Sequence, residues 1–334
     1  MAYWRLLNQA VSIRIASRWL AKGAWGLLLL VTAAAGLATL GAFFGRAWWI
    51  FDLFSNLHPQ YCVVLAVAGL IFVLRRRWWL SLPAWLFAAI NLALLLPYYV
   101  GAPAAQASGP TMRLLLSNVY SFRPDLDEVM VLVETADPDV VVLLEMIPAH
   151  WRQVQALATE YPYLFNEPLI TGTAVFSRIP LEELQPQLFL NGGRIDVLLR
   201  LQWQERPLTV LASHARAATT LVKVNQRNAH LRDLAALVAA ESGSVIVAGD
   251  LNVSPWSVYF REFLRESGLQ DGRRGRGIKP TWPAPQFSPL SGLILTPYDH
   301  FLASAGVAIH DYRVGPFVGS DHYPLVIDFA LTGK

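Results

Sequence analysis

The chain has 334 residues, of which 54% are hydrophobic and only 15% charged, an unusually apolar composition for a soluble protein, and its formal net charge is +3. It contains a single cysteine, Cys62, which excludes an intramolecular disulfide and a metal site built from several cysteines.

The charge is distributed unevenly along the chain. Residues 1–110 hold eight basic side chains and a single acid, Asp52. Removing these from the totals of 27 basic and 24 acidic residues leaves 19 and 23 in residues 111–334, a formal charge of −4. The sequence therefore predicts two physically different regions.

Three uncharged apolar segments, 24–44, 53–74 and 78–100, predict transmembrane helices in a membrane region of residues 1–100. The first is long enough to cross a hydrocarbon core of about 30 Å, and it is longer than the apolar run of a cleaved signal peptide. The second begins with polar residues, and its mainly apolar part, 61–74, is short for a full crossing. If the second segment were re-entrant, the topology of the chain would reverse.

Basic residues stay on the cytoplasmic side of a membrane and set the expected orientation. Four precede the first segment and three, at 75–77, lie between the second and third, whereas only Arg46 lies between the first and second. We therefore expect a multi-pass protein, of a bacterial inner membrane, with everything after residue 101 outside the cytoplasm. The stretch 3–20 mixes apolar residues with arginines and could lie on the inner surface as an amphipathic helix.

Residues 101–110, GAPAAQASGP, are typical of a linker, and a globular domain at 111–332 follows with alternating strands and helices. Apolar, β-branched runs predict strands at 112–116, 140–144, 173–176, 195–203, 208–212, 244–248, 298–302, 307–310 and 325–329. Helices are predicted at 124–135, 151–159, 221–240 and 256–266.

Polar residues lie at the ends of these strands. The clearest case is VIVAGDLNVSPW at 245–256, where a buried strand stops at Gly249 and is followed by Asp250 and Asn252. In an extended chain these two side chains point the same way, at a strand end where sheet enzymes build sites. Further strands are expected to end in polar residues of the same kind, namely Asn118, Glu145, His214, Asp299, Asp321 and His322.

Each of these residues also has a structural interpretation. Asp250 and Asn252 could close a turn, Asn118 could do the same, Glu145 could be a solvated charge and His214 a core histidine. The repetition at strand ends favours one shared site. Carboxylate and amide oxygens suit a hard cation such as Mg²⁺ or Mn²⁺, which polarises a phosphoryl oxygen and activates water.

At these residues the chain resembles the endonuclease/exonuclease/phosphatase superfamily, the DNase I-like metal-dependent phosphohydrolases, over roughly Met112 to Phe329. The motifs that carry the resemblance are GDLN at 249–252, YDHFLAS at 298–304 and SDHYPL at 320–325, with support from GTAVFSR at 172–178, ASHAR at 212–216 and TW at 281–282. The resemblance implies a four-layer α/β sandwich, with the site where the strand ends of two facing sheets meet. Two positions depart from the family pattern, because Leu144 and His230 stand where a Gln is usual.

The resemblance also implies roles. Asn118, Glu145 and Asp321 would hold the metal. Asp250 would orient or deprotonate the attacking water, with Asn252 beside it.

The remaining three residues would act on the phosphate. His322 would contact the scissile phosphate, supported by Asp299, which favours its charged form. His214 would stabilise the transition state or protonate the leaving oxygen. An in-line attack on phosphorus needs a base for the water, positive charge at the phosphoryl oxygens and a donor near the leaving oxygen.

The sequence thus predicts a membrane-anchored, metal-dependent phosphoester hydrolase of phosphodiesterase, nuclease or phosphatase type, whose substrate could be a nucleic acid, a phospholipid headgroup or a small phosphoester. A nuclease needs a basic footprint, and a domain at −4 lacks an obvious one. The cluster GRRGRGIK at 272–279 could be a solvated loop or could hold a nucleic-acid backbone or anionic headgroups. The alternative is an inactive membrane-anchored binding or scaffold protein, although every expected acid, His and Asn is present.

Overall fold

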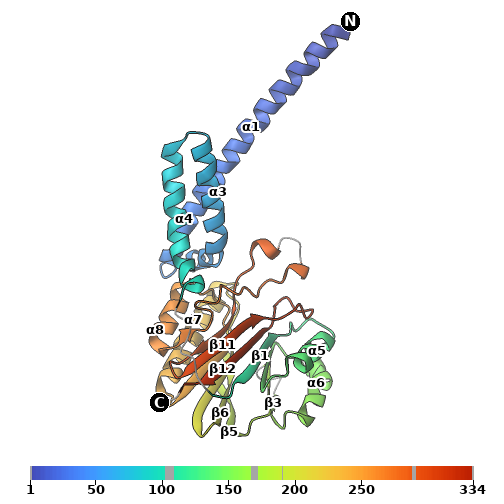
Figure 1. Ribbon diagram of the computed structural model, residues 1–334, viewed down its shortest axis with the longest axis vertical. Coiled ribbons are helices and arrows are strands. Elements are labelled where there is room, and N and C mark those ends of the chain that lie inside the picture. Colours follow the sequence, from blue (N-terminus) through green and yellow to red (C-terminus); the bar gives the residue numbers. More distant parts are fainter. Residues whose placement is uncertain (1, 102–108, 167–171, 190, 288–290, 333–334) are drawn as a thin grey trace.

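The structure is a computed structural model that describes residues 2–101, 109–166, 172–189, 191–287 and 291–332, with side chains from residue 22 onward. Most of the expected linker lies outside the described residues. An N-terminal helical region stands against one end of an α/β domain (Figure 1).

The N-terminal region contains three segments that are long and apolar enough to cross a membrane, Lys22–Phe44, Trp49–Leu74 and Trp78–Tyr99. The stretch 3–20 continues the first of them as a single helix, α1. A hairpin of α3 and α4 packs beside α1, whose N-terminal half points away from it (Figure 1). The elements are α1 (Ala2–Gly41), η1 (Ala42–Phe44), α2 (Trp49–Phe54), η2 (Ser55–Leu57), α3 (His58–Leu74) and α4 (Trp78–Tyr99).

The second apolar segment is divided, as its polar start suggests. The short α2 and η2 precede α3, which begins at His58 with Pro59 in its first turn, where the missing N–H of proline costs no helical hydrogen bond.

The α/β domain is built on two six-stranded mixed sheets. The first has the order β11-β12-β1-β2-β4-β3, with β1 and β2 parallel and the other neighbours antiparallel. Its strands are β1 (Met112–Asn118), β2 (Val140–Leu144), β3 (Tyr163–Asn166), β4 (Thr173–Ser177), β11 (Val307–Val314) and β12 (Leu325–Leu331).

The second sheet repeats this plan in the order β5-β6-β7-β8-β10-β9, with β7 and β8 parallel. Its strands are β5 (Leu181–Phe189), β6 (Arg194–Trp203), β7 (Arg206–His214), β8 (Ser244–Asp250), β9 (Gln270–Asp271) and β10 (Asp299–Ala303).

Helices cover the outer faces of both sheets, which confirms the predicted four-layer sandwich. Alternation along β1 shows the layering: Leu114 and Leu116 face the core between the sheets, whereas Leu115 faces the helices outside. The helices on the first sheet are α5 (Asp127–Ala136) and α6 (Pro148–Val154), followed by η3 (Gln155–Thr159); those on the second are α7 (Leu221–Ala240) and α8 (Val258–Ser267). Two short helices, η4 (Pro285–Phe287) and η5 (Ser291–Leu293), lie in the loop before β10.

Three strands that the sequence did not predict, β3, β5 and β9, all lie at sheet edges. Edge strands lack a continuous apolar run because one of their sides faces solvent. Charged residues or proline on that side discourage pairing with another strand. In β5 these are Glu182, Glu183 and Pro186.

Three of the polar residues expected at the ends of strands lie at or just before the starts of strands instead. Asp299 begins β10 rather than ending a strand, and it pairs with Asp250 at the end of antiparallel β8. Asp321 and His322 likewise precede β12. Strands β10 and β12 run antiparallel to their neighbours. Their first residues therefore lie at the same end of their sheets as the last residues of β1, β2, β7 and β8.

Candidate active site

The two sheets meet at the ends of their parallel strand pairs. Asn118, the last residue of β1, donates one hydrogen bond to Oε1 of Glu145 at 3.1 Å and another to Oδ2 of Asp250 at 3.2 Å. Glu145 follows β2 of the same sheet, and Asp250 ends β8 of the other sheet. One amide thus joins carboxylates from both halves of the sandwich.

Glu145 is fixed by its backbone and by Ser121. Its φ of +59° lies in the left-handed region, which costs energy for a residue with a side chain. Oε2 accepts hydrogen bonds from the backbone N–H and the hydroxyl of Ser121, at 3.1 and 3.3 Å. Burial would raise the pKa of Glu145, but His214, Asn118 and these bonds together hold it below its usual value, so the carboxylate is ionised at neutral pH.

Asp250 is buried, with 1% of its surface exposed. Burial raises the pKa of its carboxyl group to about 7, although His322 opposes the shift. A carboxyl group that titrates near neutral pH can exchange a proton with water under working conditions.

Asn252 holds Asp250 through its backbone. Its N–H donates to Oδ1 of Asp250 at 2.9 Å, while its side-chain amide donates to the carbonyl of Ala215 at 3.0 Å. The expected parallel projection of the two side chains is wrong, because β8 ends at Asp250 and Asn252 has a left-handed φ of +50°.

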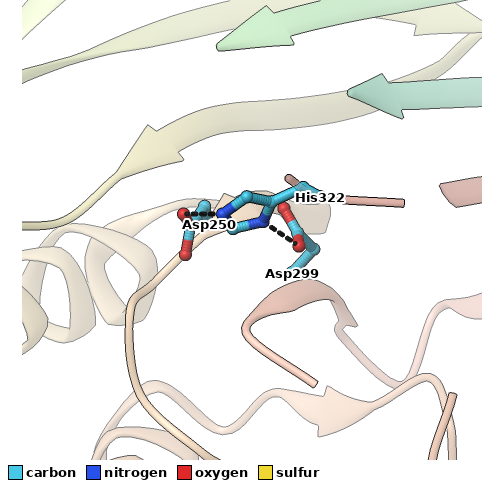
Figure 2. A group of neighbouring side chains, drawn as sticks. All are labelled: Asp250, Asp299 and His322. Atoms are coloured by element: carbon cyan, nitrogen blue, oxygen red, sulfur yellow. Dashed lines mark hydrogen bonds and ion pairs between the residues drawn. The ribbon is translucent and has the colours of Figure 1, made fainter. Parts of the chain in front are cut away.

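His322 lies between two carboxylates (Figure 2). Its Nδ1 is 2.8 Å from Oδ2 of Asp299, and its Nε2 is 3.7 Å from Oδ2 of Asp250. Burial alone would lower the pKa of His322, but Asp299 and then Asp250 raise it to about 10. The ring is therefore an imidazolium at neutral pH.

His214 ends β7 on the opposite side of the site. Its Nε2 lies 3.8 Å from Oε1 of Glu145 and 3.9 Å from Oδ2 of Asp250. Burial, followed by the nearby charge of Arg194, lowers the pKa of His214 to about 4. The neutral ring can donate a hydrogen bond at pH 7 but has no extra proton to give.

Asp321, like Glu145, is only partly buried. Its Oδ2 accepts a hydrogen bond from the indole N–H of Trp282 at 3.1 Å, and that indole stacks on Tyr298 with ring centroids 5.2 Å apart. Burial raises the pKa of Asp321, and the charge of Glu145 raises it further. Trp282 belongs to the predicted TW motif and gives that motif a function in holding an acid.

The donor chemistry fits a hard divalent cation. Asn118, Glu145 and Asp321 offer amide and carboxylate oxygens. Glu145 raises the pKa of both Asp250 and Asp321, so the carboxylates repel one another, and a cation held among them would relieve that repulsion.

A second group, Asp250, Asp299 and His322, also brings three potential ligand atoms within 4.8 Å of one another. We do not assign a metal to it, because both ring nitrogens of His322 already face carboxylates, Nδ1 that of Asp299 and Nε2 that of Asp250. It is better described as an ion-paired histidine.

Support behind His214 was missed by sequence reasoning. Asp196 is a fully buried residue near the start of β6, and its Oδ1 accepts the backbone N–H of His214 at 3.3 Å. Its Oδ2 lies 2.9 Å from Nε2 of fully buried His230, which also lies 3.1 Å from the hydroxyl of Ser213. An acid inside the otherwise apolar run IDVLL was the available signal.

The basic loop 272–279 is not simply solvated. Arg273 is fully buried, pairs with Asp271 at 2.8 Å and donates to Nδ1 of His300 at 2.7 Å. The loop also contacts α4, since the N–H of Gly277 donates to the carbonyl of Tyr98 at 2.6 Å. Arg273 is therefore unavailable to a phosphate.

Known proteins share this fold. The crystal structure of an endonuclease/exonuclease/phosphatase from Beutenbergia cavernae DSM 12333 has a TM-score of 0.54 at 21% identity, covering 67% of this chain and 72% of that one. D. rerio TDP2 complexed with single strand DNA product has a TM-score of 0.53 at 18% identity, covering 66% of this chain and 100% of that one.

Sequence comparison agrees. The chain is 29% identical over 164 residues to the Saccharomyces cerevisiae protein named "Inositol phosphosphingolipids phospholipase C", a match to 41% of this chain. It spans only 34% of that relative's length. A model of the Endonuclease/Exonuclease/phosphatase family matches residues 115–322, more than half of the chain. The chain belongs to the endonuclease/exonuclease/phosphatase family.

Proposed function

We propose that this chain is a membrane-anchored phosphoester hydrolase that works with a divalent cation, Mg²⁺ or Mn²⁺. The observation that carries the proposal is the placement of His322 between Asp299 and Asp250, opposite neutral His214. A charged donor, a carboxylate base and a neutral donor face one small volume, as attack on phosphorus requires.

The protein groups divide the reaction as follows. Asp250, with its pKa near 7, takes a proton from the attacking water. Protonated His322 donates to a phosphoryl oxygen, and Asp299 keeps it charged and oriented. Neutral His214 donates a hydrogen bond to the leaving oxygen and stabilises its negative charge without transferring a proton, so the leaving oxygen takes its proton from solvent water.

The remaining site residues organise the surroundings. Asn252 restrains the Asp250 carboxylate through its backbone N–H. A divalent cation held by Asn118, Glu145 and Asp321 would supply positive charge at the phosphoryl oxygens.

Among the possible substrates we favour a lipid phosphodiester headgroup. The loop that leads to β10 touches the helical region, since the Thr296 hydroxyl donates to the carbonyl of Asn56 at 3.2 Å. In the same loop Leu293 is 66% exposed and Ile294 is 45% exposed, which suits contact with a bilayer surface. The domain's charge of −4 and the burial of Arg273 disfavour a nucleic-acid backbone. The Saccharomyces cerevisiae relative is named as a phospholipase C of inositol phosphosphingolipids, which also favours a lipid substrate.

We further propose that the α/β domain is extracytoplasmic. The basic turn at 75–77 joins α3 to α4 at the end of the hairpin farthest from the α/β domain (Figure 1). Basic turns stay cytoplasmic, which places the domain on the other side. A reporter enzyme that is active only outside the cytoplasm should be active when fused to the C-terminus. If that fusion is inactive and a fusion to a reporter that works only in the cytoplasm is active, the assignment is reversed.

The activity is tested with the full chain in lipid nanodiscs. Hydrolysis of a phosphatidylinositol or sphingolipid dispersion, plasmid DNA, RNA and a generic phosphodiester is measured with Mg²⁺, with Mn²⁺ and with chelator. Glu145→Gln should abolish cation-dependent turnover, whereas Glu183→Gln, in an edge-strand ion pair, should not. Preference for DNA would contradict the lipid assignment, and no turnover by a folded protein would favour the inactive binding or scaffold protein.

A further inference from the structure

The loop that follows β8 lies between the candidate site and the N-terminal helices. Trp256 packs edge-on against His58 at the start of α3 and against Tyr98 near the end of α4, with ring centroids 6.2 and 6.0 Å apart. The loop begins directly after Asp250 and includes Asn252. The helical region therefore forms part of the surroundings of the site.

Asp52 is the charged residue at this contact. It is the single acid among residues 1–110, it lies in α2 and it is only 2% exposed. Its Oδ2 accepts a hydrogen bond from Nη2 of Arg227 at 2.8 Å, and its Oδ1 accepts one from the hydroxyl of Ser257 at 2.6 Å. A carboxylate buried away from water is stable only with such partners.

Arg227 connects Asp52 with the backbone next to the site. From α7, with 2% of its surface exposed, it donates through Nη1 to the carbonyl of Asn252 at 3.2 Å. Its Nε and Nη2 also bond to Oδ1 of Asn228, which fixes the plane of the guanidinium. Asn252 in turn donates its N–H to Oδ1 of Asp250. Three hydrogen bonds in series thus connect Asp52 with Asp250.

The middle member of this series needs support. Asn252 has a left-handed φ of +50°, a conformation that persists when its surroundings hold it. The guanidinium of Arg227 holds its carbonyl, and the guanidinium is in turn oriented by a charge that belongs to the helical region.

We propose that Asp52 is a positioning residue for the active site, acting through Arg227 on the backbone of Asn252 and so on the carboxylate of Asp250. The N-terminal helical region is then a part of the catalytic apparatus as well as an anchor. This inference rests on the proposed hydrolase function.

A second contact between the same two regions provides the matched control. Arg46 pairs with Glu262 of α8 at 2.6 Å, and the Arg46 side chain is 58% exposed. This pair has no bond to residues 250–252 among the described contacts. It contributes to docking without reaching the site.

The first experiment measures kcat and KM of the full chain in nanodiscs with a soluble phosphodiester. Asp52→Asn keeps the size and the acceptor for Ser257 but removes the charge that faces Arg227. We expect kcat to fall about tenfold or more with KM changed less than about twofold, because a small displacement of a catalytic group is costly. Arg46→Gln should match the parent. Equal kcat values for Asp52→Asn and Arg46→Gln would overturn the proposal.

A double variant separates positioning from docking. Asp52→Asn with Arg227→Met leaves no unpaired buried charge, so the Tm should return toward that of the parent. The carbonyl of Asn252 still lacks its donor, so kcat should stay low. Recovery of kcat together with Tm would assign Asp52 a purely structural function.

Hydrogen exchange of intact protein gives a readout that does not need turnover. In Asp52→Asn the amides of residues 250–254 and 256 should exchange about tenfold faster than in the parent or in Arg46→Gln, because their restraint is lost. If the parent hydrolyses nothing, the proposed function fails while this measurement still decides the coupling. Unchanged exchange would refute the coupling in either case.

Discussion

The two histidines of the site come from different sheets and show how neighbouring charges can separate the protonation states of two equally buried rings. His214 at the end of β7 is 6% exposed, and His322 before β12 is 5% exposed. Burial lowers the pKa of both rings. Arg194 deepens the shift at His214, whereas Asp299 and Asp250 reverse it at His322. One site therefore holds a neutral and a charged imidazole at the same pH.

The largest expected effect comes from removing the carboxylate that both rings face. Asp250→Asn keeps an acceptor for Asn118 but cannot take a proton, so kcat should fall by roughly 10³-fold or more. The measurement is cation-saturated turnover together with thermal unfolding.

The fold should survive the Asp250→Asn substitution. Because burial raises the pKa of Asp250 to about 7, the folded state disfavours its ionised form, and the resulting stability loss develops as pH rises from about 4 to 7. The variant should therefore be at least as stable as the parent at pH 8. Near-normal turnover would remove Asp250 from the proposed site.

His322→Ala should have the next largest effect, a loss of roughly 10²- to 10³-fold in kcat, because it removes the imidazolium from the phosphoryl oxygens. His310→Ala is the control, since His310 is exposed on β11. A similar loss in both variants would indicate damage to the fold instead of the site.

Asp299→Asn should change the pH profile more than the maximum rate. In the parent, turnover should rise through about pH 7 as Asp250 loses its proton and decline toward about pH 10 as His322 loses its own. Removing the carboxylate that raises the pKa of His322 lowers that pKa, so the alkaline decline should begin at least about one pH unit earlier. If the decline of turnover at high pH is unchanged, deprotonation of His322 does not cause it.

The sequence predicted that both histidines belong to the site but not which charged groups surround each of them. The apolar, β-branched runs predicted the central strands, whereas the four-layer arrangement was expected from the family resemblance. Asn118, Glu145 and Asp250 lie together at strand ends, as expected. Spacing along a chain carries no information on strand direction, so Asp299 and Asp321 were placed at the wrong ends of their strands.

Long-range contacts were equally hidden. The pairing of Asp52 with Arg227 joins residues 175 positions apart, and the neighbourhood of Arg194 and His214 forms only when β6 and β7 pair. Arg273 was expected in a solvated or ligand-binding loop because its neighbours are basic, yet it is buried against Asp271. Charge along the sequence therefore predicted net charge but not which charges face water.

The smallest expected effect on turnover comes from removing Arg194, the cation close to His214. Arg194→Met removes the charge that helps to lower the pKa of His214, so that pKa should rise from about 4 toward its ordinary value. At pH 8 the ring stays neutral and turnover should change little. NMR titration of the His214 ring in the intact chain measures the shift directly. An unmoved His214 titration would mean that burial alone keeps this ring neutral, and that the two histidines differ only through the carboxylates around His322.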